Sequence, residues 1–311
     1  MKINIQPRVS KTWEEFKQET PPESIALDWY VLKWPEFDMQ TKHINFDHHN
    51  FVQRLSTRST TGQVAMAIKM WLFDIFNHKT TNVYINDADQ DVCLSTRLLQ
   101  NNVRISGQKS EPLINKLVEI QDKLDCTAWM YPFDPNYDII QKASWVFDPY
   151  IQSRMSNRIN YMGVAEMQNI IEAVHGRIDR YLLGQSEKKE LDTRYETLWG
   201  GNLRRMVKEY WYDARMKMAY DGIKAFVSTK ELENSRYGYS IGKISEFIPF
   251  PIEELFTILN EAEWIDPHAK NRRNGWTTIG GAPRENGSSL PPQEVIKIIN
   301  EYLKKQQSRG E

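Results

Sequence analysis

The sequence predicts an α/β protein with two domains, and three observations support this fold class. Within the first hundred residues, a short apolar segment, a polar tip and a segment with helical periodicity follow one another twice. Residues 112–189 are mainly helical in pattern and rich in aromatic side chains. The remaining residues alternate between strand-like and helix-like segments. Such alternation is typical of α/β folds.

A parallel sheet is expected in the first domain. Short buried strands are predicted in "SIALDWYV" (24–31), "HINF" (43–46) and "NVYI" (82–85). The segment 59–76 has apolar residues at helical spacing, with Ser59, Thr60 or Thr61 available as N-cap, and "VCLSTRLLQ" continues the third strand as a helix. Each strand therefore leads to polar residues at its carboxyl end, where open α/β sheets build their sites.

The polar run 185–197 is the predicted domain boundary. Before it, "MGVAEMQNIIEAVHGRIDRYLLG" is an amphipathic helix that ends at Gly184. Beyond it, strands are predicted in "IKAFVSTK", "YGYSIGKIS" and "WTTIGGAP", and helices in "PIEELFTILNEAE" and "PPQEVIKIINEYLKK". We therefore expect a first domain with a helical connector at residues 1–190 and a smaller α/β domain at 198–311.

Composition narrows the class of protein. The 311 residues carry a net charge of −1, so no global field attracts a long nucleic acid, and an anionic substrate must be held locally. Only two cysteines occur, which fits a reducing compartment. The start lacks the apolar core of a signal peptide, and no run approaches the roughly 18 apolar residues of a membrane span. A cytoplasmic protein without a membrane partner is expected.

Acidic and histidine residues gather at the predicted strand ends. The residues are Asp28, Asp47, His48, His49, Asp87, Asp89 and Asp91. A mixed carboxylate and imidazole set can bind manganese, iron or zinc, and one or two such ions support hydrolysis. Each piece also has a simpler explanation: "DADQD" suits a helix N-terminus, and the histidine pair suits a polar turn. The combination of both clusters favours a metal site.

The motifs also resemble a known family. "INFDHH", followed after a gap by "STTGQVAMAI", is similar to the Asp-His-His motif of the DHH phosphoesterase superfamily and the helix that follows it. "ALDWYV" and "YINDADQDV" lie where that superfamily carries further metal-binding aspartates. "TTIGGAPRENGSSLPPQEVIKIINEYL" looks like the glycine-rich turn and closing helix of the DHH-associated domain.

The resemblance implies a role for each matching residue. It implies Asp28 as a ligand that bridges two ions, Asp47 and His48 as ligands or orienters, His49 as a hydrogen-bonding or phosphate-facing partner, and Asp87 or Asp89 as a further ligand. The His-x-Asp-x-Asp segment that usually opens the superfamily is missing from residues 1–27. One ion is then bound, or the extra acids of "DADQD" replace the missing ligands, or catalysis is lost; we favour replacement.

The C-terminal motif is the candidate substrate site. Its candidate residues are Gly280, Gly281, Arg284, Ser288 and Ser289. Glycines allow close approach of the backbone to a ligand, while the arginine and hydroxyl groups can bind a phosphate. The alternative is a flexible turn that precedes a helix starting at Pro291 or Pro292.

These expectations combine into a manganese-type, metal-dependent phosphohydrolase or phosphodiesterase. Metal-activated water would attack a nucleotide or short oligonucleotide in a cleft between the domains, with Asp47, His48 and His49 at the catalytic centre. The alternatives are a catalytically degenerate nucleotide-binding protein and an interaction protein that exposes the tryptophans of the middle region. The aromatic helices are also compatible with a homodimer. The sequence does not choose among small phosphorylated substrates.

Overall fold

The computed structural model describes residues 1–156, 158–201, 204–275, 277–283 and 286–308. The chain divides into two compact units. The first unit holds Met1–Cys126 and Asn136–Glu190, and the second holds Thr127–Pro135 and Leu191–Glu311. The change of unit after Glu190 falls inside the polar run 185–197. The assignment of 127–135 to the second unit is not signalled by the sequence pattern.

The first unit is built on a sheet with the strand order β1-β5-β2-β4-β3. Its strands are β1 (Lys2–Ile5), β2 (Ser24–Leu27), β3 (Glu36–Asp38), β4 (His43–Phe46) and β5 (Asn82–Ile85). Neighbouring strands run parallel except β3, which pairs antiparallel with β4. The predicted strand 24–31 is too long: it ends at Leu27, because Asp28 and Trp29 have left-handed φ angles of 41° and 59°.

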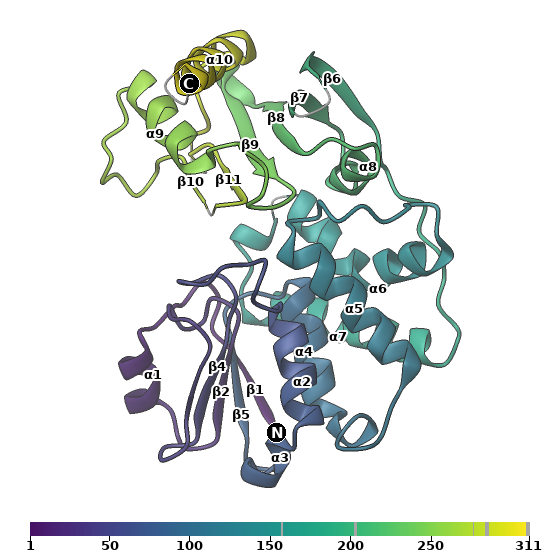
Figure 1. The fold of residues 1–311 in the computed structure, drawn as a ribbon. Helices are drawn as coiled ribbons and strands as arrows, with labels where there is room; N and C mark the ends of the chain where they lie inside the picture. Colours follow the sequence, from purple (N-terminus) through teal and green to yellow (C-terminus); the bar gives the residue numbers. More distant parts are fainter. Residues whose placement is uncertain (157, 202–203, 276, 284–285, 309–311) are drawn as a thin grey trace. The chain divides into compact units, whose positions relative to one another are not determined.

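Helices cover both faces of this sheet (Figure 1). Side chains alternate along a strand, so each face presents apolar residues that need cover. On one face, α1 (Trp13–Glu19) packs Phe16 against Ala26 and Tyr84. On the other face lie α2 (Thr60–Lys69) and α4 (Gln90–Gln100), which also contact each other. The helix predicted over 59–76 is interrupted at Trp71, whose φ is 65°, and resumes as α3 (Leu72–Ile75).

A group of longer helices packs beside α2 and α4. It consists of α5 (Pro112–Cys126), α6 (Asp138–Met155) and α7 (Val164–Leu182), with 3-10 turns at Asn102–Arg104 and Arg158–Asn160. α7 confirms the amphipathic helix predicted before Gly184. The two tryptophans of this middle region do not form an exposed patch. Trp145 is buried beneath the guanidinium of Arg177, and Trp129 is half-buried.

The second unit contains a mixed sheet with the order β10-β11-β9-β8-β7-β6. Its strands are β6 (Tyr195–Gly200), β7 (Arg204–Glu209), β8 (Ala225–Glu231), β9 (Tyr237–Lys243), β10 (Asn274–Gly275) and β11 (Ile279–Gly281). β7 and β8 run parallel, with α8 (Ala214–Tyr220) between them in the chain, and the other pairs run antiparallel. A 3-10 turn at Glu233–Ser235 joins β8 to β9.

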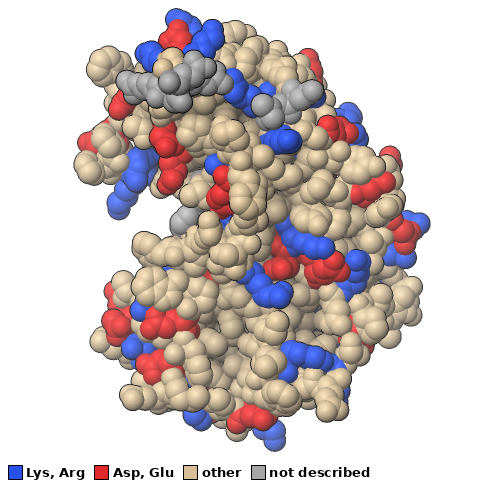
Figure 2. Space-filling view, viewed as in Figure 1, with Lys and Arg blue, Asp and Glu red and all other residues tan. Residues whose placement is uncertain are grey.

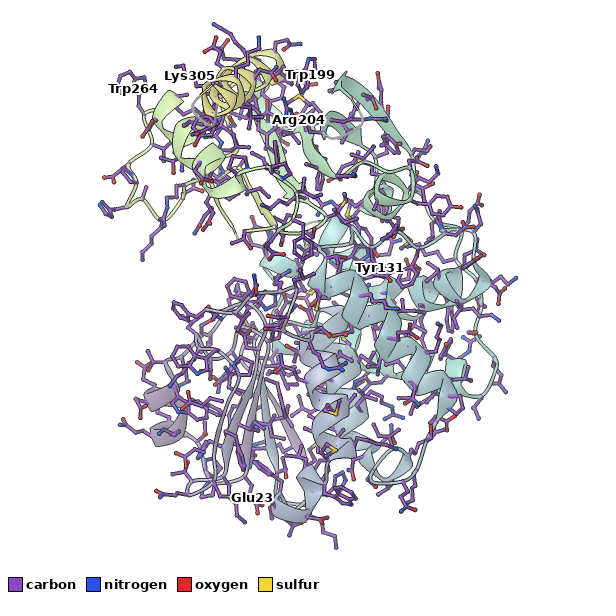
Figure 3. All side chains as sticks on the ribbon, viewed as in Figure 1. Glu23, Tyr131, Trp199, Arg204, Trp264 and Lys305 are labelled. Atoms are coloured by element: carbon purple, nitrogen blue, oxygen red, sulfur yellow. The ribbon has the colours of Figure 1, made fainter. Side chains whose placement is uncertain are left out.

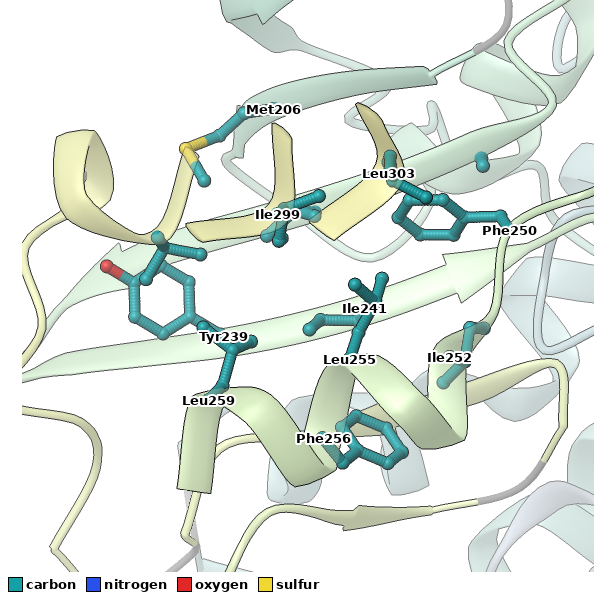
Figure 4. Packing of buried hydrophobic residues seen from close by; sticks show 13 residues of the cluster. Met206, Tyr239, Ile241, Phe250, Ile252, Leu255, Phe256, Leu259, Ile299 and Leu303 are labelled. Carbon is teal, nitrogen blue, oxygen red and sulfur yellow. The ribbon is translucent and has the colours of Figure 1, made fainter. Parts of the chain in front are cut away.

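Both faces of this second sheet are also buried. Figure 4 shows Leu255 of α9 (Ile252–Ala262) and Ile299 of α10 (Pro292–Gln307) packed toward Ile241 of β9. The alternate residue Phe226 of β8 belongs to a cluster on the opposite face, which includes Met130 from the segment 127–135. The second unit is thus a mixed α/β structure with its own core.

The surface carries charges of both signs. Figure 2 shows lysine, arginine, aspartate and glutamate interspersed over the visible face, in line with a net charge of −1. Within the described part of the chain, no helix combines the length and the apolar character that crossing a bilayer requires.

Candidate metal centre

The candidate site lies where three neighbouring parallel strands end. β5, β2 and β4 are adjacent in this order, so their carboxyl ends meet at one edge of the sheet. Asp28 follows β2, residues 47–49 follow β4, and residues 86–89 follow β5. Glu23, labelled in Figure 3, directly precedes β2 and therefore lies at the opposite, amino-terminal end of that strand. Strand order therefore brings together side chains that are far apart in the sequence.

The first turns of α2 and α4 meet at this edge. Asp91, in the first turn of α4, accepts a hydrogen bond at Oδ1 from the backbone N–H of Thr61 in α2, at 3.1 Å. The hydroxyl of Thr60, also in α2, donates to Asp28 Oδ1 at 3.0 Å. Both carboxylates are almost fully buried. The first turn of α2 thus donates one hydrogen bond to each of these two acids.

His48 lies at the centre of the cluster. Its Nε2 is 3.8 Å from Asp28 Oδ1 and 4.0 Å from Asp91 Oδ2. His49, the next residue, places Nδ1 2.9 Å from Asp28 Oδ1. The loops after β2 and β4 and the start of α4 therefore do converge in space.

Asp125 of α5 also belongs to the cluster, although the strand-end pattern does not reveal it. Its Oδ2 lies 2.6 Å from His48 Nε2. α5 packs against α2 and α4, and this packing carries Asp125 to the strand ends. Because its position depends on tertiary packing, the sequence offers no local signal for it beyond an acid near the end of a helix.

Two overlapping groups of ligand atoms result. Asp28, His48 and His49 form the first group, and His48, Asp91 and Asp125 form the second; the ligand atoms of each group all lie within 4.8 Å of one another. The shared histidine makes the two groups adjacent. This spacing can place one cation, or two close together, among the five side chains.

Asp47 lies outside both groups of ligand atoms found among the described residues, although its Oδ1 is 3.3 Å from His49 Nδ1. Its Oδ2 accepts hydrogen bonds from the backbone N–H groups of His49 and Asn50 and from the Asn50 side chain, at 2.8 to 3.1 Å. Its Oδ1 accepts from the backbone N–H of Trp29 at 3.1 Å. Asp47 therefore ties the loop after β4 to the loop after β2.

Asp87 and Asp89 are near the cluster but lie outside both groups of ligand atoms found among the described residues. Asp87 Oδ1 accepts a hydrogen bond from the Ala88 N–H at 2.6 Å. Asp89 is the N-cap of α4, with its Oδ1 accepting from the Val92 N–H at 2.8 Å, and it also shares a hydrogen bond with Asp28. The N-cap role matches the simpler explanation of "DADQD" at that position.

Burial and mutual repulsion raise the proton affinity of several cluster acids. Burial raises the pKa of Asp28 well above its usual range, with the charges of Asp91 and Asp47 adding to the effect. Burial and Asp28 act in the same direction on the pKa of Asp89. The pKa of Asp91 rises to about 7, first through burial and then through the charge of Asp125. Without a cation, these acids tend to keep protons near neutral pH.

Two other acids of the cluster respond in the opposite direction. Burial by itself would raise the pKa of Asp125, but the neighbouring His48 outweighs burial and lowers it. Burial also opposes ionisation of Asp47, and the hydrogen bond and charge of His49 reverse this, so its pKa is lowered. The cluster therefore combines carboxyl groups with raised and with lowered pKa around two imidazoles.

The residues present fit a divalent cation. His48 Nδ1 and Asp91 Oδ2 are buried and have no hydrogen-bond partner within the described ranges, while His48 Nε2 and Asp125 Oδ2 lie 2.6 Å from each other. Buried polar atoms normally have partners, and atoms that are good ligands yet lack one point to an ion. Mixed carboxylate and imidazole donors suit manganese, iron or zinc.

The glycines of the C-terminal motif have a packing role in the second unit. Gly280 and Gly281 lie in β11, between β10 and β9. A Cβ on Gly280 would come within 2.3 Å of the Phe256 ring, and a Cβ on Gly281 within 2.7 Å of the Tyr239 carbonyl oxygen. Close packing inside the sheet thus already accounts for both glycines, and neither lies in the flexible turn considered from the sequence.

The serines of that motif bind an internal carboxylate. Ser288 Oγ donates to Glu263 Oε2 at 2.8 Å, and the N–H and Oγ of Ser289 both contact Glu263 Oε1 at 2.5 Å. Arg273 completes the arrangement as a buried ion pair with Glu263. The remaining predicted substrate residue, Arg284, lies outside the described residues. The expected phosphate grip of Ser288 and Ser289 is thus occupied by a side chain of the protein itself.

Two comparisons with known proteins were negative. No family model matches the chain, and no curated protein matches it. Membership of the DHH superfamily therefore stays a prediction from the motifs, and the functional argument depends on the geometry of the cluster.

Proposed function

We propose that this chain is a metal-dependent phosphohydrolase or phosphodiesterase that acts on a nucleotide or a short oligonucleotide, and that it is a divergent relative of the DHH phosphoesterases. The observation that supports this most directly is the convergence of three carboxylates, from the loop after β2, from α4 and from α5, around His48. Binding of a hard or borderline cation explains such a concentration of buried acids economically.

The cation, a manganese-type metal bound as one or two ions, would be held by Asp28, His48, His49, Asp91 and Asp125. A divalent cation in this position polarises a phosphoryl oxygen and lowers the pKa of a water molecule toward neutrality. In this proposal two carboxylates replace those of the missing His-x-Asp-x-Asp segment: Asp91 of "DADQD" and Asp125 of α5.

The surrounding residues would orient these groups. Thr60 fixes Asp28 through its hydroxyl, and Asp47 fixes the backbone on both sides of the cluster. Such partners of ligands hold side chains in the orientation that binding requires. Their hydrogen bonds are already formed, so the cluster needs little rearrangement to accept a cation.

Arg54 is the residue that we expect to contact the phosphate. Its side chain is buried, its Nη1 donates to the Asp125 carbonyl oxygen at 3.3 Å, and its Nε has no hydrogen-bond partner within the described residues. A guanidinium with a free donor beside acidic ligands can bind a phosphoryl oxygen by a charge-assisted hydrogen bond. The phosphate-binding residue would then lie in the same unit as the acids.

A nucleotide-binding protein without hydrolytic activity is the alternative. The lack of a His-x-Asp-x-Asp segment in residues 1–27 favours it. It shares the cluster and Arg54 with the main proposal and differs only in turnover.

Metal binding and hydrolysis can be tested on the same variants. We expect the chelator-treated protein to take up stoichiometric Mn²⁺ in calorimetry, and Asp28→Asn and Asp91→Asn to lose most of this uptake. Asp74→Asn is the matched control, because Asp74 is an exposed acid of α3 outside the cluster. Phosphate or nucleotide release from a panel of nucleoside phosphates and dinucleotides should require Mn²⁺ and fall with the same two variants.

The possible results separate the alternatives. Mn²⁺ uptake without turnover of any member of the panel would favour the nucleotide-binding protein. Failure of the wild-type protein to bind Mn²⁺ or another transition metal would refute the hydrolase and point to the nucleotide-binding protein.

A further inference from the structure

Three aromatic side chains are exposed on the loops that flank the metal cluster. Trp29, Trp34 and Phe51 have exposed fractions of 37%, 49% and 77%. Trp29 and Trp34 belong to the loop after β2, and Phe51 follows the His48-His49 pair. We call these three residues the aromatic shelf. Large apolar rings exposed beside a polar site are a feature that core packing does not explain.

The shelf is continuous with the cluster. The Trp29 ring lies against the His49 ring, with centroids 4.6 Å apart and an interplanar angle of 36°. Trp34 and Phe51 contact each other edge to face, with centroids 6.3 Å apart. A ligand whose phosphate binds at the cluster would therefore meet the Trp29 ring first, and we expect Trp34 and Phe51 to extend this surface along the flanking loops.

Hydrogen bonds from the sheet fix the loop that carries two of these rings. Asn45 of β4 donates from Nδ2 to the carbonyl oxygens of Lys33 and Trp34, at 2.8 and 3.2 Å. Asn86, after β5, donates to the Trp29 carbonyl oxygen at 3.1 Å. These buried amides hold the loop in place, so the rings are positioned before any ligand arrives.

The backbone also adopts unfavourable conformations at two of these residues. Trp29 and Phe51 have φ angles of 59° and 56°, in the left-handed region that bulky side chains rarely occupy. Strained backbone that persists in a folded protein is concentrated at binding and catalytic sites. At both positions the chain keeps an aromatic residue where glycine would fit more easily.

Charge distinguishes a nucleotide from a purely apolar partner. Lys33 Nζ, which also pairs with Glu36 Oε2 at 2.5 Å, lies 5.1 Å from the centroid of the Trp34 ring, and Arg54 follows Phe51 by three residues in the chain. Planar bases stack on aromatic rings, and cations next to the rings accept the accompanying phosphates. An apolar protein partner would offer no negative charge to these cations, whereas a nucleotide offers its phosphate.

We propose that the aromatic shelf binds the base of a nucleotide whose phosphate lies at the Asp/His cluster. This inference rests on the proposed function and deepens it: the substrates would be nucleotides or oligonucleotide ends with an unpaired base, rather than sugar phosphates or inorganic phosphates. Stacking is tolerant of base identity, so the shelf would select for the presence of a base more than for its type.

The experiment compares ligands that differ only in the base or the phosphate. Binding of AMP, ribose 5-phosphate and adenosine is measured by calorimetry in the presence of Mn²⁺. For the wild-type protein we expect AMP to bind about tenfold tighter than ribose 5-phosphate, which is the scale of one stacked ring. Phe51→Leu and Trp34→Leu should remove this advantage and leave the affinity for ribose 5-phosphate unchanged.

Two further variants sharpen the result. Phe51→Tyr keeps the aromatic face and should retain the tighter binding of AMP, whereas Phe51→Leu keeps apolar area without it. Phe247→Leu is the matched control, because Phe247 is 82% exposed and belongs to the second unit. Thermal unfolding of each variant checks that the fold is kept, as expected for side chains this exposed.

The outcomes separate this inference from the proposed function. Equal binding of AMP and ribose 5-phosphate to the wild type, or unchanged AMP affinity in both leucine variants, would overturn the shelf and leave the phosphate site standing. Binding of adenosine but of neither phosphate compound would support the shelf and refute the proposed function. Sedimentation provides the last check: a dimer that Phe51→Leu converts to a monomer, with AMP affinity unchanged, would make the shelf a subunit interface and overturn the inference.

Discussion

Asp47 illustrates how the same residue type serves two purposes within one cluster. Its carboxylate accepts backbone hydrogen bonds from the Trp29, His49 and Asn50 N–H groups. Asp28, which follows β2, instead contacts side chains: His49 Nδ1 and the Thr60 hydroxyl. Against the effect of burial, the hydrogen bond and charge of His49, followed by the N–H groups of Asn50 and Trp29, lower the pKa of Asp47, while burial and the neighbouring acids raise the pKa of Asp28.

The hydroxyl of Thr60 gives a sharp test of the ligands' orientation. Thr60→Val keeps the shape of the side chain but removes the donor to Asp28 Oδ1. Loss of a partner that orients a ligand typically costs about 10- to 100-fold in metal affinity. We therefore expect Mn²⁺ affinity to fall by that factor, measured by calorimetry.

Thr80→Val is the control for Thr60→Val. Thr80 is exposed, and its hydroxyl donates to Glu23, at the edge of the sheet away from the cluster. Its Mn²⁺ affinity should match the wild type. Equal affinities in all three proteins would remove Thr60 from the site.

His175 should make the free energy of unfolding depend on pH. Its Nε2 lies 3.0 Å from both Thr96 Oγ1 and the Cys93 carbonyl oxygen. Burial lowers its pKa to about 4, and Arg97 acts in the same direction, while the Cys93 carbonyl, Asp179 and Glu172 oppose them. The folded protein therefore keeps this imidazole neutral, and unfolding allows it to bind a proton.

The sign of the pH effect follows from that difference. Because the folded pKa lies below the ordinary value of 6.5, the contribution of His175 is complete above that pH and is lost as the pH falls toward 4. The full effect is on the order of 3 kcal/mol. In urea unfolding between pH 7.5 and 4.5, His175→Gln should lose less stability than the wild type. Parallel curves for the two proteins would contradict this account.

The site residues differ in how far sequence could reveal them. Asp28, His48, His49 and Asp91 follow strands or begin a helix, so local pattern and the parallel order of the strands suffice to group them. Asp125 depends on the packing of α5 against α2 and α4, which no local pattern encodes. Ser288 and Ser289 matched the pattern of a phosphate site, but in the fold both contact Glu263, 25 and 26 residues earlier in the chain, a long-range pairing that the sequence pattern does not show.

Among the elements, α2 links the fold to the cluster. Its N-cap is Ser59, whose hydroxyl oxygen accepts from the Gly62 N–H at 3.1 Å, and its first turn carries Thr60 and Thr61. Position 59 is one of the three caps that the sequence allowed. The start of the helix therefore fixes where the two threonine donors lie.

Capping of α2 predicts an unusual order of stabilities. Ser59→Ala should lower the free energy of unfolding by about 1 kcal/mol, because the Gly62 N–H loses its partner. Ser59→Gly removes more atoms but should cost only about a few tenths of a kcal/mol, since glycine is tolerated at this position. Denaturant unfolding measures both, and a larger loss for glycine than for alanine would show that Ser59 acts through packing instead.

Three strands that the sequence did not indicate, β1, β3 and β6, share a position at a sheet edge. β1 and β3 are short edge strands of the first sheet, and β6 is largely exposed and has an irregular register with β7. Edge strands bury little apolar surface, so they lack the run or the alternation that marks a strand in the sequence. The central strands β2, β4 and β5, which are buried, were identified correctly apart from the end of β2.

For the molecule as a whole, chain order and compact units do not coincide. The segment 127–135 leaves the first unit after α5 and joins the second, before the chain returns to form α6. Met130 of this segment is 1% exposed and packs in the cluster with Phe226 and Met218. A division of the sequence at residue 190 alone would therefore remove part of the second unit's core.

Met130→Ala tests this composition of the second unit. Truncation of a buried methionine leaves a cavity and typically costs about 2–5 kcal/mol. We expect faster hydrogen exchange, measured by mass spectrometry, in β8 of the second sheet, with little change in β2 of the first. Met70→Ala, at an exposed methionine of the first unit, should change neither strand. If Met130→Ala accelerates exchange in β2 as much as in β8, the segment 127–135 stabilises the first unit too, and the division into units does not describe how the protein unfolds.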